Sequence, residues 1–131
     1  MNSKTASVVI PVGKKKVFSY LSDIENLPKW ATEFAQELKS VDGKQKIVTP
    51  MGEMFISIRA DEASGVIDIF AGPSEDQMGV FPSRVVELPG GYSAYLFTMF
   101  QSPDVSDEEF EGQFESLTRE FDNIKRIFAE A

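Results

Sequence analysis

Few side chains in this sequence are suited to acid–base chemistry in a protected site. The sequence contains no histidine, the side chain that most often transfers protons near neutral pH. Asp68 stands out because it interrupts the otherwise apolar run from Val66 to Phe70. If Asp68 faces the interior, burial raises its pKa and makes it a candidate acid or base, whereas an outward Asp68 is an ordinary solvated residue. Asp68 is therefore the candidate catalytic residue, and the sequence leaves its orientation open.

Arg84 is the predicted partner of Asp68. An antiparallel hairpin with a short loop brings Arg84 beside Val66 and diagonally across from Asp68. If Glu87 lies outside, alternation places Arg84 inside, where an arginine beside an aspartate holds a carboxylate, phenolate or carbonyl oxygen. The alternative is a structural ion pair, and a bulge at Pro82 would reverse the facing of Arg84.

The other candidates for ligand binding are aromatic and apolar side chains. Trp30, the single tryptophan of the chain, either stacks on a ligand or plugs the core. Tyr95, Phe97 and Met99 alternate along a predicted strand, so they share the face that we expect a long C-terminal helix to cover. Phe114 belongs to that helix. All five residues line a cavity if one exists and form ordinary core if it does not.

Composition limits the classes of function. The length of 131 residues predicts one domain over residues 1–131, and the net charge of −8 argues against nucleic acid as a partner. Since cysteine and histidine are both absent, we expect no metal site and no cofactor. No apolar run is long enough for a membrane span, and the N-terminus lacks the core of a signal peptide. These features predict a cytoplasmic protein and leave its oligomeric state open.

The longest predicted element is an amphipathic helix from Ser106 to Glu130. Ser106 and Glu109 have the spacing of a capping box, which fixes the start of the helix. Apolar residues then recur at alternating intervals of four and three, so they form one stripe that needs a broad apolar partner. The stripe consists of Phe110, Phe114, Leu117, Phe121, Ile124 and Phe128.

The partner of this helix is a predicted antiparallel sheet. A first strand at Thr5 to Ile10 precedes two short helical segments at Gly13 to Leu21 and Asp23 to Phe34. Six strands then follow in hairpin succession, at Gln36 to Val41, Lys46 to Thr49, Glu53 to Ala60, Val66 to Ala71, Met78 to Leu88 and Tyr92 to Gln101. The order predicts an α+β fold, in which a curved antiparallel sheet of about six to seven strands wraps around the C-terminal helix.

Six segments carry a resemblance in their order along the chain, namely residues 17–23, 26–31, 65–68, 84–86, 96–100 and 106–110. Together they resemble the START-like or SRPBCC superfamily, and within it small bacterial proteins labelled polyketide cyclase/dehydrase-like. The resemblance implies the helix-grip fold, with one opening of its cavity near Trp30. Members include lipid carriers, aromatic cyclases, hydrolases and co-chaperone domains, so the resemblance does not select a function.

Three functions remain as hypotheses. The first is binding of a small hydrophobic or aromatic molecule in a cavity between sheet and C-terminal helix, oriented by Asp68 and Arg84. The second is a polyketide cyclase or dehydratase-type enzyme that uses the same cavity, with Asp68 or a tyrosine moving a proton. The third is a protein-interaction domain with a filled core, which uses its acidic helix face or an open sheet edge.

Overall fold

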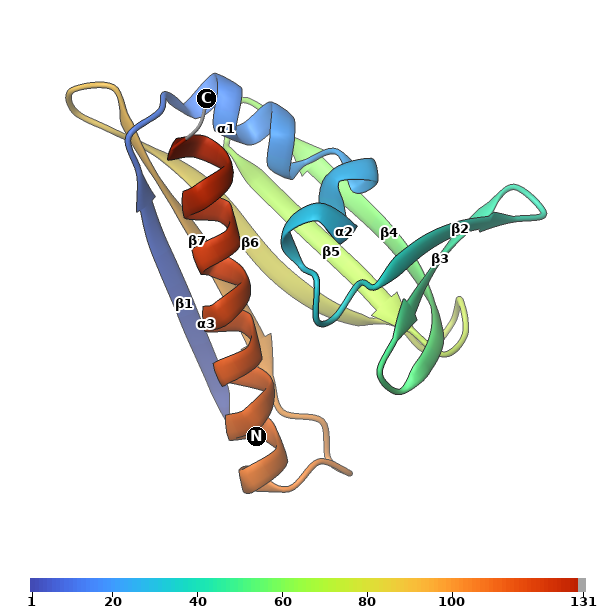
Figure 1. The fold of residues 1–131 in the computed structure, drawn as a ribbon. Coiled ribbons are helices and arrows are strands. Elements are labelled where there is room, and N and C mark those ends of the chain that lie inside the picture. Colours follow the sequence, from blue (N-terminus) through green and yellow to red (C-terminus); the bar gives the residue numbers. More distant parts are fainter. Residues whose placement is uncertain (130–131) are drawn as a thin grey trace.

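Seven antiparallel strands form one curved sheet, and a long C-terminal helix lies across its concave side (Figure 1). The computed structural model describes residues 1–129. The strand order is β1-β7-β6-β5-β4-β3-β2. The strands are β1 Ser3–Ile10, β2 Glu37–Val41, β3 Lys44–Thr49, β4 Gly52–Asp61, β5 Val66–Gly72, β6 Gly79–Leu88 and β7 Tyr92–Phe100. This is a helix-grip fold, so the predicted fold class is confirmed.

The C-terminal helix, α3, spans Asp107–Ala129; Glu130, which the sequence places in this helix, lies outside the described residues. Its predicted capping box is formed: the Glu109 amide donates to Ser106 Oγ over 3.1 Å, and the Ser106 amide donates to Glu109 Oε1 over 3.2 Å. Most of the predicted stripe is buried, namely Phe110, Leu117, Phe121, Ile124 and Phe128. Within residues 1–129, no helix combines the length and apolarity needed to cross a membrane.

Three short helical segments connect β1 to β2. They are α1 at Lys14–Leu21, the 3₁₀ helix η1 at Ile24–Asn26, and α2 at Leu27–Trp30. The second predicted helical segment therefore stops at Trp30 and does not reach Phe34. Residues 31–36, here called the strap, run from the end of α2 to β2 beside α3 (Figure 1).

Strand β6 loses one of its two partners at Pro82. It pairs with β5 without a bulge from Gly79 to Arg84, whereas its pairing with β7 begins only at Ser83. Proline has no backbone N–H to donate, which explains why the β6–β7 ladder stops there. The last residues of β7, Thr98–Phe100, pair with β1 alone. We call the unpaired stretch between Gly79–Pro82 and Thr98–Phe100 the seam.

Candidate functional site

Six aromatic side chains meet between the concave side of the sheet and α3. Neighbouring rings lie 5.6–6.3 Å apart, centroid to centroid, mostly edge to face or tilted, as favoured for aromatic pairs. This aromatic cluster consists of Trp30, Phe34, Phe81, Tyr95, Phe97 and Phe121. Trp30 and Tyr95 are 2% and 0% exposed, whereas Phe34 of the strap and Phe81 beside the seam are half-buried. The cluster therefore extends from the deep core to the surface.

Two polar groups lie within this apolar cluster. The Tyr95 hydroxyl donates to Ser83 Oγ over 2.9 Å, and Ser83 Oγ donates in turn to the Ile67 carbonyl oxygen over 2.6 Å. Burial raises the pKa of Tyr95 well above its ordinary value, so the phenol stays neutral. By contrast, the Trp30 Nε1–H is buried with no hydrogen-bond partner among residues 1–129. Such orphaned donors are rare in folded proteins because leaving one unpaired is unfavourable.

Polar contacts fasten the strap to α3. Glu120 Oε2 accepts the backbone N–H groups of Glu33 and Phe34, over 3.0 and 2.9 Å. One helical turn further on, Asn123 Nδ2 donates to the Trp30 carbonyl oxygen over 3.0 Å. The Glu33 carboxylate in turn accepts from two nitrogens of Arg119, over 2.9 and 2.7 Å. These contacts hold Phe34 and Trp30 over the helix and thereby position two rings of the cluster.

Glu120 is the one charged residue among the buried side chains of residues 1–129. Burial raises the pKa of its carboxyl to about 7, against a smaller opposing effect of the two strap N–H groups. Sequence reasoning missed this residue, because the helix carries many acidic residues and such residues usually lie on a solvated face. A signal was available: Glu120 lies three residues after Leu117 and four before Ile124, both of the apolar stripe. That spacing puts its carboxylate at the edge of the buried face.

Asp68 and Arg84 lie on the outer face of the sheet. Ile67 and Ile69 face the core, so Asp68, between them, points the other way and stands opposite Arg59 on β4. The predicted pairing of Arg84 with Val66 is confirmed, and both point outward. Arg84 is exposed, and its Nε donates to a turn carbonyl over 2.9 Å.

The prediction that Arg84 faces inward is wrong, because it assumed that an exposed Glu87 marks the outer face of β6. Glu87 is exposed, as expected, yet by alternation it shares a face with the buried Ser83 and Val85. It is solvated because it lies near the end of β6, beyond the edge of the core. Exposure therefore did not reveal the face to which it belongs. The predicted juxtaposition of Arg84 with an interior ligand is not present.

The remaining predicted residues lie on the inner side. Tyr95, Phe97 and Met99 are all buried, and the first two rings contact Phe121 of α3, as expected for the helix-facing side of β7. Phe114 is half-buried on α3, with Lys4 Nζ 5.2 Å from its ring centroid. Whether these residues bind a ligand stays a prediction.

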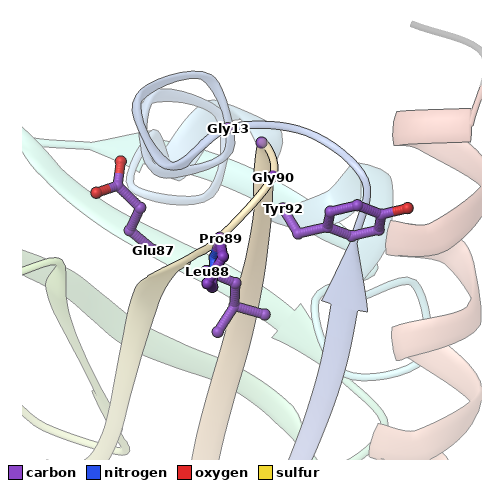
Figure 2. A pocket seen from close by; sticks show the side chains of 7 residues that line it. Gly13, Glu87, Leu88, Pro89, Gly90 and Tyr92 are labelled. Carbon is purple, nitrogen blue, oxygen red and sulfur yellow. The ribbon is translucent and has the colours of Figure 1, made fainter.

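Two hollows on the described part of the chain both open at the surface, away from the aromatic cluster. The first, of ≈ 490 Å³, lies at the hairpin between β6 and β7 (Figure 2) and is lined by Gly13, Glu87, Leu88, Pro89, Gly90, Gly91 and Tyr92. The second, of ≈ 520 Å³, lies between α1 and the turn after β4, lined by Lys14, Lys15, Glu62, Ala63 and Glu87. Rings of the aromatic cluster occupy the space in which the sequence predicted a cavity.

Comparison with known proteins reveals the same fold at low sequence identity. No protein-family model matches the chain, and no curated protein matches its sequence. The protein XoxI from Bacillus cereus superposes with a TM-score of 0.76 at 16% identity, over 98% of this chain and 96% of that one. A START superfamily protein from Mycobacterium smegmatis gives 0.66 at 12% identity, over 98% and 97%.

A third similar structure is longer than this chain. BexL, a di-domain ARO/CYC from the BE-7585A biosynthetic pathway, gives a TM-score of 0.74 at 10% identity over 99% of this chain. The match covers 47% of BexL. At such identities the likeness establishes a START-like, SRPBCC-type fold.

Proposed function

From this helix-grip fold, we propose that the chain binds a small hydrophobic or aromatic molecule between the sheet and α3. One observation carries the proposal: the aromatic cluster runs from a half-buried rim to a deep, unpaired Trp30 Nε1–H. Binding sites for small molecules are typically lined by aromatic side chains with a few placed polar groups. The similar structures support the fold alone, so the proposal depends on these residues.

The ligand enters where Phe34 meets Phe81. These two half-buried rings lie 6.0 Å apart, one on the strap and the other beside the seam. Outward movement of Phe34 exposes Phe97, whose ring lies 5.9 Å from Phe81. A bound molecule then replaces ring–ring contacts with contacts of its own, and each Å² of additional buried apolar area contributes roughly 25 cal/mol. Because rings fill the site, entry of a ligand requires Phe34 to move outward.

A protein-interaction domain is the second candidate, and the filled interior favours it. The first turn of α3 carries Asp107, Glu108 and Glu109, an acidic surface to which a basic partner would be attracted. The cyclase-type alternative has less support, since Asp68 lies on the outer face and the hydroxyl hydrogen of the buried Tyr95 is already donated to Ser83.

A titration with a neutral apolar dye such as Nile red separates the two candidates. We expect a saturable dye signal, accompanied by a change in emission of Trp30, the single tryptophan. The matched variants Phe97→Ala and Leu96→Ala alter adjacent residues on the inner and outer faces of β7. Only Phe97→Ala should change the dye affinity, with cooperative thermal unfolding as the check that both variants fold. A signal that does not saturate in the wild-type protein favours the interaction domain.

A further inference from the structure

We infer that the bound molecule is neutral and carries a hydrogen-bond acceptor, such as a ketone or quinone oxygen, that takes the hydrogen of Trp30 Nε1. The inference rests on the proposed function and names the chemical class of its ligand. Three features of the interior support it: the orphaned donor, the direction of the neighbouring hydroxyl hydrogens, and the distribution of charge.

Trp30 supplies the donor. Its indole is 2% exposed, its Nε1–H has no acceptor within residues 1–129, and its ring contacts Tyr95, Phe97 and Phe121. A buried N–H without a partner has lost its bond to water and gained none in return. An incoming acceptor restores that bond, whereas a pure hydrocarbon leaves the donor unpaired. The interior therefore discriminates between two molecules of the same shape.

The hydroxyl groups nearby do not compete for this role. The Ser83 hydroxyl donates its hydrogen to the Ile67 carbonyl oxygen, so the Tyr95 hydroxyl must be the donor in its hydrogen bond with Ser83 Oγ. A hydroxyl has one hydrogen to donate, and both are already engaged. Among the polar groups of the aromatic cluster, only the Trp30 indole still has a hydrogen to offer. A ligand oxygen at the cluster is therefore recognised by the indole.

The charges around the cluster exclude an acidic ligand. Arg59 and Arg84 are on the outer face of the sheet, and the ammonium of Lys4, near Phe114, is paired with Glu111. The Glu120 carboxyl group binds the backbone of the strap that carries Phe34, so the charged residue buried beside the cluster is itself acidic. Burying an acidic ligand there is unfavourable, because the nearby cations Lys4 and Arg119 are already paired with Glu111 and Glu33.

Three naphthalenes with substituents of similar size test the inference: isopropenylnaphthalene, neutral acetylnaphthalene and anionic naphthoate. By calorimetric titration, acetylnaphthalene should bind about two- to tenfold more tightly than isopropenylnaphthalene, in which a CH₂ group replaces the carbonyl oxygen, the gain expected from one hydrogen bond. Naphthoate should bind most weakly. The single indole N–H resonance of the chain should move downfield in heteronuclear NMR spectra with acetylnaphthalene and not with isopropenylnaphthalene.

Replacing the indole of Trp30 by benzothiophene, through incorporation of the tryptophan analogue, removes the N–H and keeps the ring shape. The advantage of acetylnaphthalene over isopropenylnaphthalene should vanish while isopropenylnaphthalene binds as before. Trp30→Phe is the simpler second variant, with circular dichroism as its folding check.

Two other results would overturn the inference in different ways. Equal affinities for isopropenylnaphthalene and acetylnaphthalene, or tightest binding of naphthoate, would refute the ligand class and leave the proposed function intact. If none of the three probes binds saturably, the proposed function fails, and the inference fails with it.

Discussion

The inner and outer faces of strands β5 and β6 carry polar groups of opposite kinds. On the inner face Ser83 joins the Tyr95 hydroxyl to a backbone carbonyl, and no ionised side chain of either strand reaches the core. On the outer face Asp68 and Arg84 stand in partly or fully exposed positions. The charged side chains of these strands therefore lie on the solvated face, whereas their neutral hydrogen-bonding groups lie beside the aromatic rings.

This difference changes which residues are relevant to function. Charged side chains in apolar strands attract notice in a sequence because they look out of place, but a strand with one solvated face accommodates them at little cost. Neutral polar side chains do not stand out in a sequence, although a buried donor without a partner is the more unusual structural feature. The contrast between the faces is open to test at single positions.

The largest expected effect is on the inner face. Tyr95→Ala should lower the free energy of unfolding by about 3–5 kcal/mol, the usual cost of deleting a buried aromatic ring. Leu96→Ala, the next residue on the outer face, should cost about 1 kcal/mol or less. Urea denaturation of the two variants measures both values. Similar losses would contradict the contrast between the faces, and Tyr95→Phe provides a milder variant should Tyr95→Ala not fold.

The next effect concerns the buried charge on the inner side. Burial raises the pKa of Glu120 to about 7 from an ordinary value of 4.5, so between these pH values the folded protein holds a proton that the unfolded chain releases. Stability due to Glu120 therefore falls as pH rises through this window, by about 2–3 kcal/mol. Glu120→Gln should remove that slope in urea denaturation measured at several pH values.

The control for this prediction is Glu115→Gln. Glu115 is exposed on the same helix, and its substitution changes the net charge by the same amount without touching the strap. The control should keep the wild-type slope between pH 4.5 and 7. A parallel loss of slope in both variants would assign the effect to overall charge.

The smallest effects are expected on the outer face. Asp68→Asn and Arg84→Gln should each change the free energy of unfolding by less than about 0.5 kcal/mol, because exposed polar residues and ion pairs contribute little. Both variants should bind Nile red as the wild-type protein does. A loss of dye binding in either would show that the outer face takes part in the site, contrary to its position.

Much of the fold followed from periodicity and spacing. The capping box at Ser106, the stripe of α3 and the pairing of Arg84 with Val66 are local or nearly local features, and the structure has all three. The facing of β5 was not predictable, because Val66 and Phe70 on one side are as apolar as Ile67 and Ile69 on the other. A strand of this composition is compatible with either orientation.

The interior of the site was harder to predict for a different reason. The contacts of Asn123 with the Trp30 carbonyl oxygen and of Glu120 with the strap join residues about 90 positions apart, and sequence spacing does not predict such contacts. Trp30 was recognised as a candidate, but whether its ring would line a space or fill one depends on how tightly Phe97 and Phe121 pack against it.

Pro82 has a mechanical consequence for the molecule. No ladder hydrogen bond joins Gly79–Pro82 to Thr98–Phe100, so β6 and β7 are paired over only part of their length. On either side of the seam the strands keep their other pairing, β6 with β5 and β7 with β1. These two parts can separate at the seam without loss of a β6–β7 ladder hydrogen bond, which is the movement that the proposed entry of a ligand beside Phe81 requires.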